Sequence, residues 1–87
     1  MLLELEDRMT PLAGRANAVK DSVEHLRQQQ EGAGFSLRHD ISASETSMEL
    51  YMGKAEAALN SRNPQAAKKY IDLAEREIEN LEKFFGR

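Results

Sequence analysis

The sequence predicts an all-α fold, an antiparallel three-helix bundle with coiled-coil-like seams. Apolar residues recur at alternating steps of three and four along three consecutive segments, a period of 3.5 residues that is typical of helices packed lengthwise. The 87 residues include only five glycines and two prolines, so few positions interrupt a helix. The segments follow one another through short connections, which favour antiparallel neighbours.

Length and composition indicate one domain, residues 1–87, with a core near the smallest size that is stable on its own. Apolar residues make up 40% and charged residues 31% of the chain, a balance that argues against disorder. The net charge is −3, and no segment has the stripe of basic residues that nucleic-acid binding requires. We therefore expect no nucleic-acid partner. No stretch approaches the roughly 18 apolar residues of a membrane span, and we expect no membrane insertion.

The first helix is predicted over residues 2–31. Its seam keeps the three–four spacing without a slip through Leu2, Leu5, Met9, Leu12, Ala16, Val19, Val23 and Leu26. Pro11 opposes this continuity, because proline inside a helix removes a backbone hydrogen bond and costs about 3 kcal/mol. Thr10 and Pro11 could instead begin a new helix, which would leave residues 2–9 as a separate turn. The unbroken register favours one helix with a kink at Pro11.

The second helix is predicted over residues 36–61, after a connection that contains two glycines. Phe35 is placed to act as a hydrophobic staple at its start. The seam continues through Leu37, Ile41, Ser44, Met48, Tyr51, Ala55 and Ala58. Residues 41–47 are rich in Ser and Thr, and the capping-box pattern of Ser42 and Glu45 gives an alternative start five or six residues later.

The third helix is predicted over residues 64–85. Asn63 is a good N-cap, and Pro64 sits at the first helical position, where its missing N–H costs nothing. Gly86 supplies the C-terminal stop. The seam of this helix consists of Ala67, Ile71, Ala74, Ile78, Leu81 and Phe85.

Two further features concern contacts of the last two helices. Asp72 with Arg76 and Glu79 with Lys83 are acid-before-base pairs four residues apart, expected to support the outer face by about 0.3–0.5 kcal/mol each. Four alanines should face one another near the turn and let the two backbones approach closely: Ala55, Ala58, Ala67 and Ala74.

No motif indicates catalysis or a cofactor, and we interpret the chain as a non-catalytic protein without a cofactor. Its acidic residues alternate with bases around helix faces, whereas paired catalytic carboxylates converge in a pocket with separated pKa values. The chain contains Ser, His and Asp but no nucleophile elbow, and it is too short to wall an oriented pocket.

A metal site is the other chemical hypothesis. The chain has no cysteine, which excludes thiolate ligands and disulfides. His25 and His39 flank the glycine-containing connection, and together with Glu24 or Asp40 they could hold a zinc ion. Neither histidine has the spacing of a ligand pair, so we favour two solvated histidines and assign no metal ligand.

Apolar residues that the seams leave without a partner indicate where another protein would bind. The first helix is longer than the third, so we expect the N-terminal part of its seam to lack a covering helix within the chain. Three leucines also miss the seams and would form a second contact face if they align. The candidate partner contacts are Leu2, Leu3, Leu5, Met9, Leu50 and Leu73. The cluster of Met48, Tyr51 and Met52 is a candidate adaptable surface, but we favour a core position for it, with Met52 at the border.

We therefore expect a non-catalytic helical protein–protein interaction or scaffolding module, whose partner is a protein: a second copy or another domain. Two alternatives are an accessory or regulatory helical domain of a larger protein, membrane-associated or extracytoplasmic, and a small metal-binding helical bundle. The in-register seams and the lack of a reactive cluster favour the first hypothesis.

Overall fold

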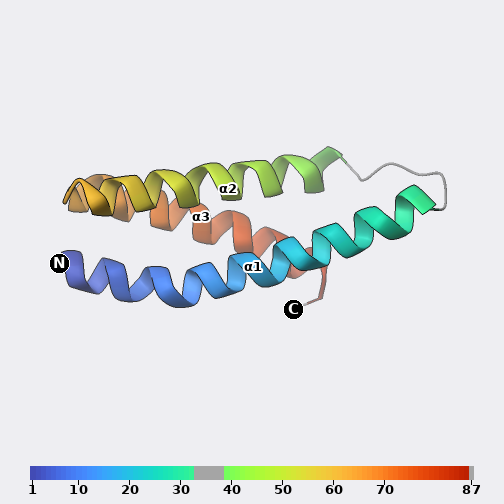
Figure 1. The fold of residues 1–87 in the computed structure, drawn as a ribbon, viewed down its shortest axis with the longest axis horizontal. Coiled ribbons are helices and arrows are strands. Elements are labelled where there is room, and N and C mark those ends of the chain that lie inside the picture. The colour runs from blue at the N-terminus through green and yellow to red at the C-terminus, as the bar shows by residue number, and fades with distance from the viewer. Residues whose placement is uncertain (33–38, 87) are drawn as a thin grey trace.

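The structure, a computed structural model, describes residues 1–32 and 39–86 and confirms the predicted three-helix bundle. The helices are α1 (Leu2–Gly32), α2 (His39–Asn60) and α3 (Pro64–Phe84), and they run up, down and up along one elongated body of 47 × 19 × 16 Å. In Figure 1, α2 and α3 lie side by side and α1 runs along the pair. Within the described residues, no helix combines the length and the hydrophobicity that crossing a membrane requires.

Helix α1 is continuous through Pro11, as the register predicts, and it curves along its length in Figure 1. Residues 2–9 are therefore helical and not a separate turn. Leu5 and Met9 lie just before the proline and keep only 4% and 8% of their surface exposed. Burying two such side chains contributes about 1.5–3 kcal/mol each, so together they offset the proline penalty of about 3 kcal/mol.

The expectation that the N-terminal seam of α1 lacks a covering helix is wrong. The α2–α3 turn lies at the same end of the bundle as the N-terminus, so the hairpin covers Leu5 and Met9. The excess length of α1 is at its other end, where its last turns extend beyond the end of α3 (Figure 1). Leu26 on that segment is only half-buried.

The α2–α3 hairpin is the closest helix pair of the bundle. The four predicted interface alanines are all buried, which allows the two backbones to approach. The hairpin turn closes with two backbone hydrogen bonds: Asn63 N–H donates to Ala58 O (2.9 Å) and Arg62 N–H donates to Leu59 O (3.0 Å). This is a Schellman motif, and Arg62 occupies its left-handed position with φ of 56°, where glycine is the usual residue.

The ends of α3 follow the sequence prediction closely. The Asn63 side chain accepts a hydrogen bond from Ala66 N–H (3.2 Å), and Pro64 occupies the first helical position. Gly86 has φ of 75° and stops the helix, while its N–H donates to Lys83 O (3.1 Å). Phe85, predicted as the last helical residue, is the C-cap.

The start of α2 is settled only in part. The helix already includes His39, so the alternative start near Ser42 is wrong. The predicted start at residue 36 and the staple by Phe35 lie outside the described residues.

Fifteen buried apolar residues from all three helices form one core, and among the described residues no polar or charged side chain is fully buried in it.

Candidate interaction surfaces

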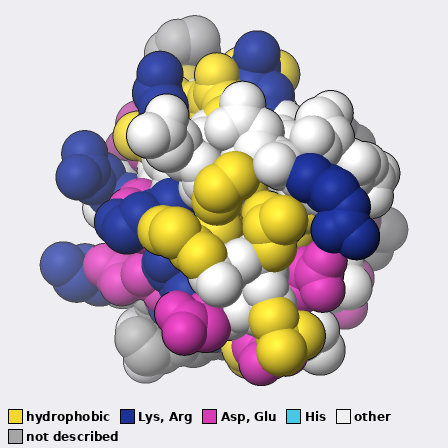
Figure 2. All heavy atoms as spheres, turned by 90° about the vertical axis from the view of Figure 1, so that its left-hand side faces the viewer, with side chains coloured by type: hydrophobic (Ala, Val, Ile, Leu, Met, Phe, Trp, Pro, Cys, Tyr) yellow, Lys and Arg dark blue, Asp and Glu magenta, His cyan; other side chains and the backbone are white. Residues whose placement is uncertain are grey.

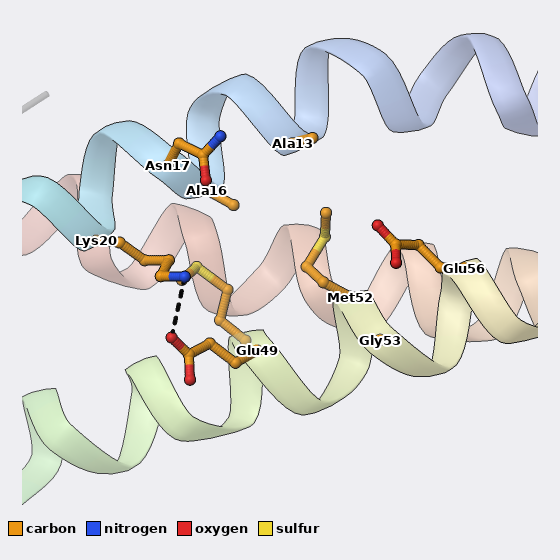
Figure 3. A pocket seen from close by; sticks show the side chains of 9 residues that line it. Ala13, Ala16, Asn17, Lys20, Glu49, Met52, Gly53 and Glu56 are labelled. Carbon is orange, nitrogen blue, oxygen red and sulfur yellow. Dashed lines mark ion pairs between the residues drawn. The ribbon is translucent and has the colours of Figure 1, made fainter.

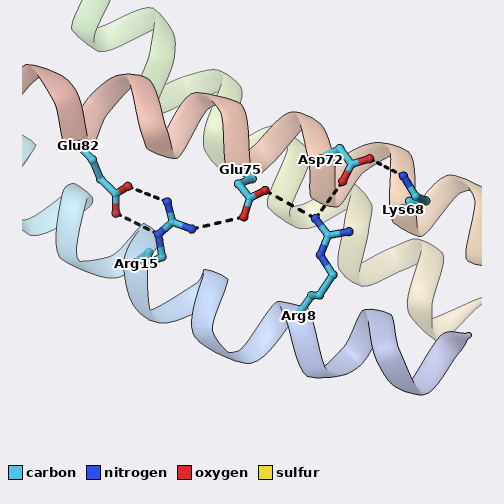
Figure 4. Close-up of polar contacts among 6 residues, drawn as sticks. All are labelled: Arg8, Arg15, Lys68, Asp72, Glu75 and Glu82. Atoms are coloured by element: carbon cyan, nitrogen blue, oxygen red, sulfur yellow. Dashed lines mark hydrogen bonds and ion pairs between the residues drawn. The ribbon is translucent and has the colours of Figure 1, made fainter. Parts of the chain in front are cut away.

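A ladder of ion pairs joins α1 to α3 along one side of the bundle (Figure 4). We call it the charge ladder; its members are Arg8, Arg15, Lys68, Asp72, Glu75 and Glu82. Arg15 donates twice to the Glu82 carboxylate, from Nη2 at 2.7 Å and from Nε at 3.0 Å. Arg8 donates to Asp72 (2.9 Å), and Glu75 lies between the two arginines, 3.4 Å from Arg15 and 3.7 Å from Arg8. The ladder fixes the register of α1 against α3.

The intrahelical pair of α3 in the charge ladder differs from the two that the sequence predicted, and neither the pair of Asp72 with Arg76 nor that of Glu79 with Lys83 is among the ion pairs of the described residues. Asp72 pairs instead with Lys68 (2.9 Å) and with Arg8. Hydrogen bonds from Lys68 and then from Arg8 lower the pKa of Asp72 below its ordinary value. The hydrogen bond to Glu82 raises the pKa of Arg15. These groups are partly exposed, so each pair contributes at most about 1 kcal/mol.

A groove separates α1 from α2 on another side of the bundle. Its wider part is a hollow of about 490 Å³. Small residues line it, Ala13, Ala16 and Asn17 on α1 and Gly53 on α2, and Met52 stands between the helices with its side chain pointing toward Ala13 and Ala16 (Figure 3). Small side chains on both walls leave space that the chain itself does not fill.

A second hollow of about 370 Å³ continues this groove toward the α2–α3 turn. Ala13 and Glu56 line both hollows, so the two form one groove, which extends on α1 from Glu6 to Lys20. At a rise of 1.5 Å per residue this stretch is about 21 Å long. Along part of the same stretch, the α1–α3 side has a hollow of about 130 Å³ beside the charge ladder.

The charges along the groove differ between its two ends. Near the loop end, Arg27 pairs with Glu45 (3.2 Å) and Lys20 pairs with Glu49 (3.3 Å), which draws α1 toward α2. Toward the turn, Glu6 and Glu56 line opposite walls, and neither pairs with a base among the described residues. Like charges on facing walls repel each other, so nothing electrostatic draws the helices together there.

The end of the bundle near the N-terminus has exposed apolar residues. Figure 2 views this end and shows hydrophobic side chains gathered near its centre, with Lys, Arg, Asp and Glu around them. Met1 and Leu3 are 68% and 69% exposed, and Leu2 is half-buried. Single exposed apolar residues are normal on a small protein.

The six candidate partner contacts do not form one surface. Leu5 and Met9 belong to the core of the chain itself, so they are not accessible contacts. Leu2 and Leu3 lie at the end face. Leu50 is 54% exposed, ten residues before the end of α2, and so about 15 Å from that end.

Leu73 and its surroundings form a separate outer face of the hairpin. Leu73 itself is half-buried. Tyr51 and Tyr70 stack at a centroid distance of 6.4 Å across α2 and α3, and the ammonium groups of Lys54 and Lys69 each lie 5.4 Å from the Tyr70 ring. The Met48–Met52 cluster follows the favoured interpretation, since Met48 is buried and Met52 packs at the border of the core.

The histidines are not brought into a metal site by the described residues. His25 is exposed, and its Nε2 lies 3.1 Å from the amide nitrogen of Gln29. It lines a hollow of about 500 Å³ together with Leu26 and Phe85, where α1 extends beyond the end of α3 (Figure 1). The side chain of His39 lies outside the described residues. Within the described part of the chain, no three His, Asp or Glu side chains gather in a metal-binding geometry.

The groove residues were missed at the level of sequence, although a signal for them exists. Glu6, Ala13, Lys20 and Arg27 recur every seven residues beside the seam of α1, the spacing of a row that faces a neighbouring helix. The small Ala13 in this row marks the place where α1 and α2 leave a gap.

No family model, curated protein or solved structure matches the chain.

Proposed function

We propose that the chain is a non-catalytic protein–protein interaction module that binds a helix of its partner in the groove between α1 and α2. The observation that carries this proposal is the groove itself, which extends about 21 Å between two helices and is lined by Ala13, Ala16, Gly53 and Met52. A partner helix in it would complete a four-helix arrangement.

The backbone of the groove walls favours a helix over an extended peptide. The walls are helical and their backbone groups already bond within α1 and α2. An extended peptide would find no backbone partners there and would bury unsatisfied N–H and C=O groups. A helix satisfies its own backbone and can rely on side-chain packing alone.

The side chains of the groove suit such packing. Ala13 and Ala16 are one turn apart on α1 and leave a depression that can accept a ridge of a second helix. Met52 is unbranched and flexible, so it can adjust its rotamer to the shape of an incoming side chain. A partner helix of about 14 residues, four turns, would fill the groove.

The proposal is tested by selecting binders from a displayed library of amphipathic helices of about 20 residues. The bait is the full 87-residue chain. The Ala13→Trp variant blocks the groove, and the Ala18→Trp variant is the matched control, because Ala18 is exposed on the same helix and does not line the groove.

We expect binders that lose at least about tenfold in affinity with Ala13→Trp and keep it with Ala18→Trp, a difference of about 1.4 kcal/mol or more. Circular dichroism of both variants verifies that the chain remains helical. A selection without binders, or binders that the two variants affect equally, would contradict the groove as the binding site.

A further inference from the structure

Acidic side chains outnumber basic ones along the groove: Glu6 and Lys20 line it from α1, and Glu49 and Glu56 line it from α2. Glu6 on α1 and Glu56 on α2 line the open part and make no ion pair with described residues, while Glu49 pairs with Lys20 at 3.3 Å. The groove therefore has three carboxylates against one ammonium group. Resting on the proposed function, we infer that the partner is a basic amphipathic helix of another protein, with Lys or Arg on both flanks of an apolar stripe.

The spacing of the carboxylates defines the pattern of such a helix. Glu49 and Glu56 are seven residues apart on α2, about 10 Å along the helix axis. A helix packed lengthwise presents its own flanking residues at the same interval, so two bases seven residues apart would face both carboxylates. A third base on the opposite flank would face Glu6, because no base of α1 lines the groove before Lys20, while Arg8 and Arg15 pair with α3.

A second copy of the chain fits this groove less well than a foreign helix. Two copies joined groove to groove with their helices parallel would bring Glu6 and Glu56 of one copy against the same acids of the other, which is repulsive. The outer side of α3 does carry bases, namely Lys69, Arg76 and Lys83 at seven-residue intervals. However, the leucine beside this row, Leu73, is already half-buried in its own hairpin and offers little surface to fill the groove.

The experiment extends the helix library, with apolar residues at the seam positions and Lys or Glu encoded at equal frequency on both flanks. It is selected in parallel on the natural chain and on the double variant Glu6→Lys, Glu56→Lys. We expect binders of the natural chain to be enriched in Lys, to bind the double variant at least about fivefold more weakly, and to lose affinity at 1 M salt. The double variant should enrich Glu instead.

Three results would overturn the inference, and they are distinguishable from failure of the proposed function. Groove-dependent binders with equal Lys and Glu content would leave the helix-binding function standing and remove its charge preference. Lys-rich binders that the double variant does not weaken would place the recognition elsewhere. If sedimentation of the chain alone shows self-association that Lys69→Glu with Arg76→Glu abolishes, the occupant is a second copy. A selection without any groove-dependent binder would contradict the proposed function itself.

Discussion

The α2–α3 hairpin and helix α1 are held in the bundle by different means. The hairpin pairs two helices across small residues, and Ala55, Ala67 and Ala74 are completely buried between them. α1 lies farther from both helices and contributes larger side chains to the core, such as Leu12 and Val23. Small residues let the backbones of α2 and α3 approach closely without a gap between them. The wider spacing between α1 and α2 leaves the groove.

The ion pairs show the same division. Every ion pair between different helices among the described residues has its base on α1: Arg8, Arg15, Lys20 and Arg27. None of them joins α2 to α3. A short turn and close packing set the register of the hairpin, while α1, which connects through a longer stretch, adds ion pairs to its buried seam. Two of the acids without an ion pair among the described residues, Glu6 and Glu56, line the groove between α1 and α2.

The largest expected effect comes from truncating the core that both regions share. Ile78 on α3 is completely buried, so Ile78→Ala should lower the free energy of unfolding by about 2–5 kcal/mol. Asn80→Ala, an exposed control two residues away, should stay within about 0.5 kcal/mol. Urea denaturation followed by circular dichroism measures both variants. Equal destabilisation would show that the seam of α3 is not the centre of the core.

Enlarging an alanine separates the close interface from the open one. Ala67→Leu adds volume between α2 and α3, where the alanine is completely buried, and should cost about 1–3 kcal/mol. Ala13→Leu adds the same atoms in the groove, where space is available, and should leave the melting temperature within about 2 °C. Similar losses in the two variants would mean that the groove is as tightly packed as the hairpin.

The turn of the hairpin contains a residue that we expect to be replaceable with a gain. Arg62 adopts the left-handed conformation, which costs about 1 kcal/mol for a residue with a Cβ atom. Arg62→Gly should therefore raise the free energy of unfolding by about 0.5–1 kcal/mol. The neighbouring Ser61→Gly, at a position without a positive φ, should bring no gain. Chemical denaturation of the two variants compares them directly.

The smallest expected effect concerns the charge ladder and appears in acid. The pKa of Asp72 is lower in the folded chain than the ordinary 3.8, so its stabilisation is complete above that pH and is lost as the pH falls through the lowered pKa. Asp72→Asn should reduce the loss of stability on acidification, by less than about 1 kcal/mol. The exposed Asp21, which has no ion pair among the described residues, provides the control Asp21→Asn. A pH series of melting curves in which both variants match the natural chain would remove Asp72 from the ladder.

The three helices were predictable from the sequence because local signals agree with the packed structure. The seam of α3 and its cap at Asn63 match the structure residue by residue, and the register of α1 overrode the local penalty of Pro11. The long-range contacts were not predicted. Asp72 has a base four residues away on either side, and only the position of Arg8 on α1 makes Lys68 and Arg8 its partners.

The groove was missed for a related reason. The apolar pattern identifies which residues face the core but gives no measure of how far apart two helices pack, and this spacing depends on side chains from all three helices. Leu5 and Met9 were assigned to an uncovered end because the helix lengths alone do not tell which end of α1 extends beyond the hairpin. The sequence pattern predicts each helix, but it does not give the distance between helices or their relative positions along the bundle axis.

Three of the four methionines test the central claim, an open groove that accepts a partner helix, most directly. Met52 lines the groove, Met48 is completely buried, and Met1 is 68% exposed. With ¹³C-labelled methionine methyl groups and a soluble paramagnetic agent, we expect relaxation of Met52 to lie between that of Met1 and that of Met48. A lysine-rich helix from the selection should protect Met52 and leave Met1 and Met48 unchanged. If Met52 is as protected as Met48 in the chain alone, or stays exposed when the helix binds, the groove is not the binding site.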